Sequence, residues 1–252
     1  MIEQLAVAVL GANGRMGAEA VQAIEAAADL NLVAALGRND SLETLVDAGA
    51  RVVVDLTVPE STDANVTFAV EHGMHAVVGT TGWDQQRLAR LEELLTGRPG
   101  VGVLIAPNFA LGSVLASAFA AKASRYFESA EIIELHHPEK VDAPSGTAVR
   151  TAQLISAERA AAGLPPSPDA TRGGRPGARG CDVDGVRVHS VRLRGLVAHQ
   201  EVLLGGPGEQ LTFRHDSFDR ASFMPGVLLG VRNVAANPGL TVGLDGYLDL
   251  GL

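Results

Sequence analysis

Two adjacent histidines and a lysine follow a predicted strand near the middle of the chain. The segment 131–135 reads Glu-Ile-Ile-Glu-Leu, which is typical of a β-strand, and it leads into His136, His137 and Lys140. A neutral histidine can accept or donate a proton near pH 7, and a nearby lysine supplies a fixed cation or a second acid. We therefore interpret this loop as a candidate site for acid–base chemistry.

A helix start follows the loop. Pro-Ser-Gly-Thr at 144–147 opens a predicted helix that extends to about Ala162. Ser145 is a suitable N-cap, and the backbone N–H groups of Gly146 and Thr147 would then point outward, where the helix dipole favours an anion. The sequence thus predicts a proton donor and an anion site within one short segment.

A metal site is an alternative interpretation of the histidines. His136, His137 and Asp142 all carry atoms that can bind zinc. Adjacent histidines on an extended segment point in different directions, however, and no third well-spaced ligand is evident. We therefore expect no metal ion at this loop.

Composition limits the classes of function. The chain of 252 residues is long enough for one large domain or two smaller ones, with 46% hydrophobic and 19% charged residues. A formal net charge of -9 argues against general affinity for nucleic acids or anionic membranes. The sequence shows no signal peptide and no apolar run approaching the ~20 residues of a transmembrane helix. Cys181 is the only cysteine, which excludes an intrachain disulfide and fits a reducing, cytoplasmic setting.

The N-terminal segment has the pattern of a nucleotide-binding β-α-β unit. An apolar strand at 5–10 is followed by the glycine-rich turn 11–17, a predicted helix at 16–28 and a strand at 31–36. Glycines let the backbone approach a pyrophosphate, and the helix start supplies N–H donors and a positive dipole. Because the spacing is GxxGxxG rather than GxGxxG, a tight turn without a ligand is the alternative.

Further apolar runs extend this pattern towards a sheet. Predicted strands at 51–56, 75–78 and 101–105 alternate with helical stretches, which favours a doubly wound α/β sheet. Ligands bind such sheets at the carboxyl ends of the strands. The residues that we expect at that edge are Gly11, Thr57, Gly79 and Pro107.

The rest of the chain has a different pattern. Residues 111–127 are predicted as a helix, and 163–184 form a long loop rich in proline, glycine and arginine. Three predicted strands and a last helix follow, which indicates an α+β region with hairpin connections. The strands are expected at 186–193, 196–204 and 210–215, and the helix at 220–234.

The loop and helix start also resemble a family signature. The pattern Glu-x-His-x-x-x-Lys-x-Asp-x-Pro-Ser-Gly-Thr-Ala of the dihydrodipicolinate reductase family begins here at Glu134 and continues without a gap to Ala148. Gly11–Gly17 resembles the GAxGRMG turn of that family, and Val191–Glu201 is similar to one of its sheet segments. The sequence around Gly180 is most similar to actinobacterial members.

The resemblance implies a fold and an activity. It implies a Rossmann-like, doubly wound parallel sheet in a dinucleotide-binding domain of residues 1–107 and 216–252. A second α+β domain with a mixed sheet, residues 108–215, would bind substrate and assemble a homotetramer. The implied reaction is the reduction of 4-hydroxy-tetrahydrodipicolinate, a small cyclic dicarboxylate, to tetrahydrodipicolinate by NADPH or NADH. This reaction involves loss of water and serves diaminopimelate and lysine biosynthesis.

The resemblance also implies roles for individual residues. His136 would be the catalytic proton donor or acceptor, and Lys140 a second proton donor. The residues implied to bind substrate are His137, Ser145, Gly146 and Thr147. The residues implied to bind the cofactor are Gly11, Ala12, Asn13, Gly14, Arg15, Met16, Arg38, Gly79, Thr80, Thr81, Ala106, Pro107, Asn108 and Phe109.

The end of the second strand bears on the choice of cofactor. An acid at this place would bind the ribose 2′-OH of NADH, but Gly37 stands where family members often carry Asp or Glu, and Arg38 follows it. An arginine without the acid favours a 2′-phosphate and hence NADPH. Asp40 could still serve NADH if the loop is displaced, so both cofactors remain expectations.

Some residues have two interpretations. Arg172, Arg175 and Arg179 make the long loop basic, either as a solvated segment or as a flap that attracts the dicarboxylate. Trp83 could pack at the mouth of the cofactor site or simply at a helix start. We expect the three histidines on predicted strands to be hydrogen-bonded or surface side chains rather than catalysts, namely His189, His199 and His215.

Two other classes of function remain open. Another oxidoreductase of the same plan, such as an amino-acid or semialdehyde dehydrogenase, would lack the arrangement at 140–147. A non-enzymatic dinucleotide sensor would keep the fold but would need neither His136 nor Lys140.

Overall fold

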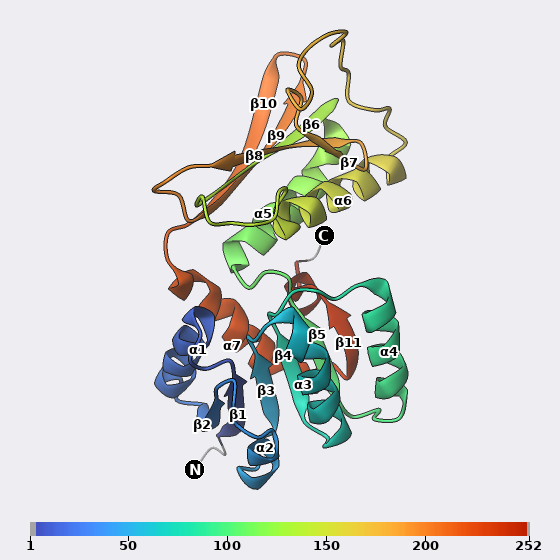
Figure 1. Cartoon of the computed structure of the whole chain (residues 1–252). Helices are drawn as coiled ribbons and strands as arrows, with labels where there is room; N and C mark the ends of the chain where they lie inside the picture. Colours follow the sequence, from blue (N-terminus) through green and yellow to red (C-terminus); the bar gives the residue numbers. More distant parts are fainter. Residues whose placement is uncertain (1–3, 251–252) are drawn as a thin grey trace. The chain divides into compact units, whose positions relative to one another are not determined.

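The chain divides into two compact units, each built around its own sheet (Figure 1). The computed structural model describes residues 4–250. Unit 1 comprises residues up to 110 and residues 220–250, and unit 2 comprises residues 111–219. Within residues 4–250, no helix has both the length and the apolar character needed to span a membrane.

Unit 1 contains a six-stranded sheet in which every pair of neighbours is parallel. All residues of the strands at 52–55, 75–78 and 102–105 are buried, as expected when helices cover both faces of a parallel sheet. The strands, in spatial order, are β11 (Gly239–Val242), β5 (Gly102–Ile105), β4 (His75–Val78), β3 (Val52–Asp55), β1 (Leu5–Leu10) and β2 (Leu30–Leu36).

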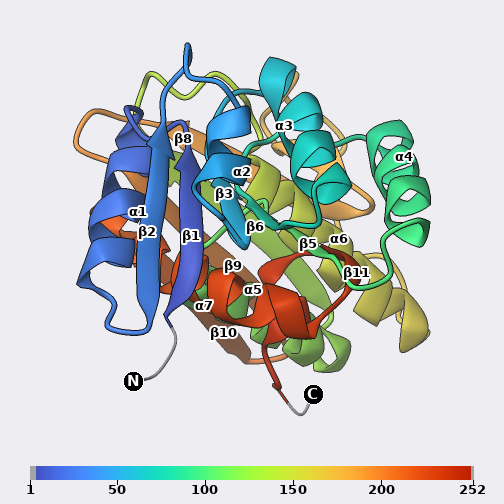
Figure 2. The same ribbon diagram turned by 90° about the horizontal axis from the view of Figure 1, so that it is seen from below.

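Helices lie on both faces of this sheet, so the predicted doubly wound fold is confirmed. Residues of α2 and α3 pack with outward side chains of β1 and β3, and α4 packs over β4 and β5. In Figure 2, α7 lies on the other side of the sheet, and it contacts α1 there. The helices are α1 (Arg15–Ala26), α2 (Glu43–Asp47), α3 (Pro59–Glu71), α4 (Gln85–Thr96) and α7 (Met224–Asn233).

The last strand of unit 1 comes from the C-terminal tail. β11 pairs in parallel with β5, and Gly239 lies opposite Gly102. A side chain at Gly102 could not be accommodated, because its Cβ would lie 2.1 Å from the Val234 carbonyl oxygen. The predicted tail helix at 220–234 begins as a 3-10 turn at Arg220–Phe223 and becomes α-helical only from Met224.

Unit 2 contains a mixed five-stranded sheet in the order β10-β9-β6-β8-β7. β6 and β8 are parallel, and the other neighbours are antiparallel. The strands are β6 (Ser129–His136), β7 (Cys181–Val183), β8 (Val186–Arg192), β9 (Ala198–Gly206) and β10 (Glu209–Ser217). The mixed sheet of the predicted α+β region is therefore present.

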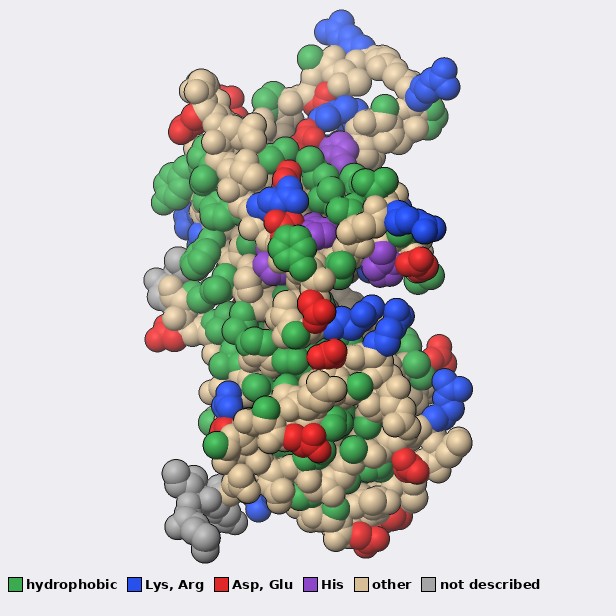
Figure 3. All heavy atoms as spheres, turned by 90° about the vertical axis from the view of Figure 1, so that its left-hand side faces the viewer, with side chains coloured by type: hydrophobic (Ala, Val, Ile, Leu, Met, Phe, Trp, Pro, Cys, Tyr) green, Lys and Arg blue, Asp and Glu red, His purple; other side chains and the backbone are tan. Residues whose placement is uncertain are grey.

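One face of this sheet is covered by two helices, α5 (Leu111–Ala123) and α6 (Gly146–Ala161). Apolar side chains from both helices and from alternate strand positions form the core of the unit. Within residues 4–250 no helix of unit 2 covers the opposite face. Figure 3 shows hydrophobic side chains together with histidines and charged side chains on the surface of this unit.

Two predicted boundaries in unit 2 differ from the structure. The helix predicted over 111–127 ends at Ala123 and continues as a 3-10 turn at Ser124–Tyr126. The long loop ends in β7, which forms a hairpin with β8. The two-residue turn of that hairpin, Asp184-Gly185, has positive φ at both residues, the conformation that an Asp-Gly hairpin turn prefers.

Candidate active site

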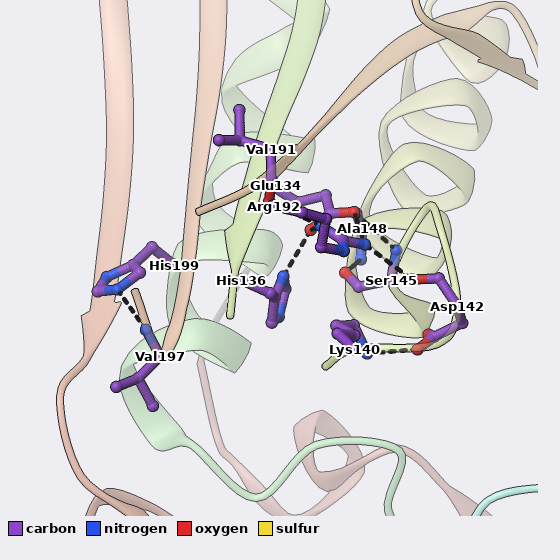
Figure 4. Close-up of polar contacts among 10 residues, drawn as sticks. All are labelled: Glu134, His136, Lys140, Asp142, Ser145, Ala148, Val191, Arg192, Val197 and His199. Atoms are coloured by element: carbon purple, nitrogen blue, oxygen red, sulfur yellow. Dashed lines mark hydrogen bonds and ion pairs between the residues drawn. The ribbon is translucent and has the colours of Figure 1, made fainter. Parts of the chain in front are cut away.

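The centre of the candidate site is Glu134, a carboxylate near the end of β6. Its side chain has no solvent exposure, and it points towards the helices because side chains alternate along a strand. His136 follows two residues later on the same face, and its Nδ1 lies 2.5 Å from Glu134 Oε2 (Figure 4). The predicted proton-transfer residue is therefore bonded directly to a buried acid.

Arg192 is the cationic partner of this acid. It ends β8 and lies opposite His136 in the parallel pairing of β8 with β6. Its Nη1 donates to Glu134 Oε2 at 2.9 Å and its Nη2 to Oε1 at 2.8 Å, a two-pronged ion pair. Nη2 also donates to the carbonyl oxygen of Asp142 at 2.7 Å, so the same guanidinium fixes the loop after β6.

The start of α6 is bonded to the same carboxylate. The Ser145 N–H donates to Glu134 Oε1 at 3.2 Å, while Ser145 Oγ accepts from the Ala148 N–H at 3.2 Å. The predicted N-cap is thus confirmed. The first turn of α6 carries no acidic side chain, and an added Cβ at Gly146 would meet no atom within 4 Å, so there is open space beside this helix start. The Gly146 N–H is hydrogen-bonded to the Asp142 carboxylate, which shows that this N–H group can hold an anion.

The hydrogen bonds decide the charge of Glu134. Burial alone would raise the pKa of this carboxyl, but hydrogen bonds from His136 and Arg192 outweigh burial and lower the pKa from 4.5 to about 2. An ionised carboxylate only accepts hydrogen bonds, so the proton between the two groups belongs to His136 Nδ1. The assigned tautomer leaves His136 Nε2 as the atom available for proton exchange.

Lys140 lies in the loop between β6 and α6. Its Nζ is 2.7 Å from Asp142 Oδ1, and its N–H donates to the His137 carbonyl in a turn. Burial tends to raise the pKa of Asp142, but the bond from Lys140 lowers it below its ordinary value. His137 Nδ1 lies 3.1 Å from Glu139 Oε2 without the alignment of a hydrogen bond.

Glu134 was predicted only as part of the motif, and Arg192 was not predicted as a site residue. A charged residue at an inward position between Ile132 and His136 is a signal that the alternation of β6 could have provided. Arg192 gave no such signal, because its partner is 58 residues away in the sequence.

The glycine-rich turn of unit 1 has the geometry of a phosphate cradle. Gly11 has φ of 77°, and an added Cβ there would lie 2.6 Å from the Leu56 carbonyl oxygen. A Cβ at Gly17 would lie 2.0 Å from the Gly11 carbonyl oxygen, so α1 can approach the turn only with glycine there. Gly14 caps α1, whose first turn contains no acidic residue. The turn therefore fits the pyrophosphate of a dinucleotide.

The end of β2 is bonded to this turn. The Leu36 carbonyl accepts from the N–H groups of Gly11 and Ala12 at 2.9 and 3.0 Å. The next N–H, that of Gly37, donates to Asp40 Oδ2 at 2.7 Å, so the Asp40 carboxylate is folded back onto the strand end. Arg38 is exposed between them.

The two later loops also lie at the carboxyl ends of the strands, as predicted. Gly79 follows β4, and its Cβ would lie 2.6 Å from the Phe109 ring, so close packing accounts for this glycine. Thr80 is buried, and its hydroxyl donates to Asp55 Oδ1 at 3.0 Å. Ala106 and Phe109 are buried as well, whereas Pro107 is exposed. Contacts of these buried residues with a cofactor would therefore involve mainly their backbone.

Most of the residues with two interpretations have structural roles. Arg179 is paired with Glu131 and Asp169, so it anchors the long loop, while Arg172 and Arg175 are exposed. Trp83 packs against the core between α3 and α4. Two of the three strand histidines are hydrogen-bonded to carboxylates, as predicted, and the third is partly buried: His189 with Glu131, His199 with Asp216, and His215.

No cluster of three or more histidine, cysteine, aspartate or glutamate side chains that could hold a metal ion occurs within residues 4–250. His136, His137 and Asp142 therefore form no such cluster.

Two family models match almost the whole chain. The model described as "Dihydrodipicolinate reductase, N-terminus" matches residues 5–109, and "Dihydrodipicolinate reductase, C-terminus" matches residues 112–248. The 4-hydroxy-tetrahydrodipicolinate reductase of Streptomyces griseus is 65% identical over 99% of this chain and 100% of its own length. That of Nocardia farcinica is 61% identical over 97% and 98%.

Solved structures agree with these matches. The dipicolinate-bound dihydrodipicolinate reductase from Paenisporosarcina sp. TG-14 is 37% identical, with a TM-score of 0.85 over 97% of this chain and 100% of that one. GenD2 from gentamicin A biosynthesis, in complex with NAD, has a TM-score of 0.62 at 16% identity over 98% and 91%, which shows a shared fold alone.

The low pKa of Glu134 predicts how stability depends on pH. Because the folded pKa is about 2 and the ordinary value is 4.5, the carboxylate stabilises the fold above about pH 5, and this contribution is lost as pH falls towards 2. The loss of unfolding free energy in Glu134→Gln relative to the natural protein should therefore shrink as pH falls below about 5. Urea unfolding at a series of pH values measures it.

Glu128→Gln is the matched control, because Glu128 is an exposed carboxylate of the same unit. Its unfolding curve should follow that of the natural protein at each pH. A Glu134→Gln difference that stays constant down to the lowest pH would mean that the ion pair does not hold this carboxylate ionised.

Proposed function

Because the chain belongs to the dihydrodipicolinate reductase family, we propose that it reduces 4-hydroxy-tetrahydrodipicolinate to tetrahydrodipicolinate with NADPH or NADH. This reaction serves diaminopimelate and lysine biosynthesis. The observation that carries the proposal is the bonding of His136 and of the start of α6 to one buried carboxylate, Glu134. A proton-transfer group and an anion site are thereby fixed relative to each other.

The dinucleotide would be held by unit 1. The glycine-rich turn and the start of α1 would bind the pyrophosphate, and the loops after β4 and β5 would bind the nicotinamide half. When bound, the reduced nicotinamide supplies a hydride. The chain would bind the substrate carboxylates and supply protons to the reduced substrate ring and to the leaving hydroxyl. It would also hold substrate and cofactor in a fixed orientation.

His136 is the proposed proton-transfer residue. Glu134 holds its Nδ1 proton, so Nε2 faces the reaction, and Arg192 keeps Glu134 from leaving its position. Lys140 is the proposed second proton donor. Its ammonium donates to the Asp142 carboxylate, which favours the charged, proton-carrying form of the lysine.

The substrate carboxylate would bind at the start of α6. The N–H groups of Gly146 and Thr147 follow the N-cap Ser145, and His137 lies at the other end of the same loop. The relative from Paenisporosarcina binds dipicolinate, a dicarboxylate, which supports this chemistry for the present chain. No basic cluster elsewhere is needed if the helix start and His137 share the anion.

The uncovered face of the mixed sheet is the proposed assembly surface of a homotetramer. Ile133, Leu135, Val191 and Leu203 point to this face and are only partly buried within the chain. Aliphatic side chains on an uncovered sheet face favour contact with another protein surface. We also propose a cytoplasmic location, where the exposed, unpaired Cys181 would stay reduced.

NADPH oxidation in a coupled assay, in which dihydrodipicolinate synthase makes the substrate, tests the function directly. Turnover should require the synthase and both of its substrates. Cofactor binding without any turnover in this mixture would favour a sensor, and turnover with other substrates alone would favour another dehydrogenase.

Lys140→Ala should lower turnover by about 10²–10⁴-fold, the usual effect of removing a positioned acid. Folding and cofactor binding should persist, because Lys140 lies in a loop and its ammonium is paired with Asp142 of the same loop. Lys122→Ala is the control, since Lys122 forms an ion pair with Glu158 in the same unit. Near-normal turnover of Lys140→Ala would remove this lysine from the mechanism.

Pyridine-2,6-dicarboxylate should inhibit competitively with substrate, because it is a flat and stable analogue of the substrate ring. Thr147→Val should raise its inhibition constant by about tenfold, the effect of losing one hydrogen bond to a charged group. The backbone N–H and the carbonyl, which accepts from Thr151, are kept. Equal inhibition of both proteins would locate the carboxylate elsewhere.

We predict that the natural protein uses NADPH at least as well as NADH, and that Gly37→Asp combined with Arg38→Ala shifts the preference towards NADH. A carboxylate at Gly37 would repel the 2′-phosphate that Arg38 is proposed to bind. Steady-state kcat/KM for both cofactors, at one salt concentration, gives the ratio.

Gly37→Ala separates charge from size in this experiment. An added Cβ would lie 2.5 Å from Asn13 Nδ2, so either substitution requires the Asn13 amide to move. The alanine variant should keep the natural ratio. A natural protein that strongly prefers NADH would indicate that Asp40, already bonded to the Gly37 N–H, binds the ribose instead.

A further inference from the structure

A second buried carboxylate, Asp55, lies at the end of β3 in unit 1. It is 1% exposed, and within residues 4–250 no lysine, arginine or histidine side chain forms an ion pair with it. Burial of a carboxylate without a cation is costly unless hydrogen bonds replace its water. Asp55 therefore depends on hydrogen bonds from neutral groups.

Neutral donors surround this carboxylate. Oδ1 accepts from the Thr57 N–H at 2.9 Å, from the Thr57 hydroxyl at 2.5 Å and from the Thr80 hydroxyl at 3.0 Å. Oδ2 accepts from Asn65 Nδ2 at 3.1 Å. A group that accepts four bonds and donates none is in its carboxylate form. Asp55 thus carries a negative charge that no cationic side chain of the described residues offsets.

The Thr80 bond connects this charge to the loop after β4. The same loop is held from its other end by Arg87, whose Nη1 donates to the carbonyl oxygens of Gly82 and Pro59 at 3.0 Å each. The loop is therefore fixed on both sides before any ligand binds. A fixed charge beneath a rigid loop acts on a ligand without the cost of reorganisation.

We propose that the negative charge of Asp55 assists the hydride-transfer step by favouring the oxidised form of the cofactor bound at the Thr80 loop. This inference rests on the proposed function, in which that loop binds the nicotinamide half. Hydride leaves the C4–H bond of the reduced ring with its electron pair and forms a C–H bond on the substrate, while His136 or Lys140 supplies the proton. The ring is left with a positive charge, which a buried anion stabilises.

Asp55→Asn isolates the charge. Three of the four hydrogen bonds converge on Oδ1, so an asparagine oxygen at that position keeps the bonds from Thr57 and Thr80. The new amide group would face Asn65, whose own amide can rotate by half a turn to present oxygen. This rotation removes the bond from Asn65 Nδ2 to the Thr57 hydroxyl, but the Thr80 bond that connects residue 55 to the loop is kept. The variant therefore removes the anion while retaining its link to the loop.

The experiment measures the dissociation constants of NADPH and NADP⁺ by calorimetry, without substrate. In Asp55→Asn, NADP⁺ binding should weaken by about tenfold relative to NADPH binding, since only the oxidised ring is cationic. An equal change for both forms, or no change, overturns the proposal, because a purely structural residue would affect both forms alike.

Thr80→Val is the matched variant, and it also decides the matter if Asp55→Asn does not fold. It removes the hydroxyl bond to the loop but keeps the charge, so the ratio of the two dissociation constants should stay close to that of the natural protein. If Thr80→Val weakens NADP⁺ binding relative to NADPH binding as much as is expected for Asp55→Asn, loop geometry controls the preference and the proposal fails. Turnover of the natural protein in the coupled assay tests the proposed function separately.

Discussion

The candidate active site depends on one constraint, which is that the Glu134 carboxylate is buried as an anion. Such a charge persists only if hydrogen bonds replace its water, and here the donors come from three elements: His136 on β6, Arg192 on β8 and the Ser145 N–H at the start of α6. The hydrogen bonds that stabilise the Glu134 carboxylate therefore fix the tautomer of His136, link the ends of β6 and β8, and fix the start of α6.

The two acids that are buried within residues 4–250 are stabilised in different ways. Glu134 is paired with a guanidinium, so its charge is largely cancelled and its effect is geometric. Asp55 is surrounded by hydroxyl and amide donors, so its charge remains available to act on a neighbouring ligand. Each acid lies at or near the carboxyl end of a strand. The kind of donor around it decides whether it orients a neighbouring side chain or attracts a positively charged ligand.

The elements that could be predicted from the sequence are those that depend on residues close together in the chain. Continuous apolar runs identified β3, β4 and β5, and the N-cap Ser145 was found because a capping side chain lies next to its helix. β11 was not predicted as a strand, because four residues have no period of their own and become a strand only beside β5. The ion pair of Arg192 with Glu134 was missed for the same reason, since pairing of distant strands creates it.

The pairing of β11 with β5 has a consequence for synthesis of the protein on the ribosome. All strands of unit 2 lie between residues 129 and 217, so its sheet can close before residues 239–242 have emerged. Until then β5 remains an open sheet edge, available to any other strand. The part of the chain that is made first is thus completed last, and the nascent N-terminal half must avoid aggregation while its final strand is still being translated.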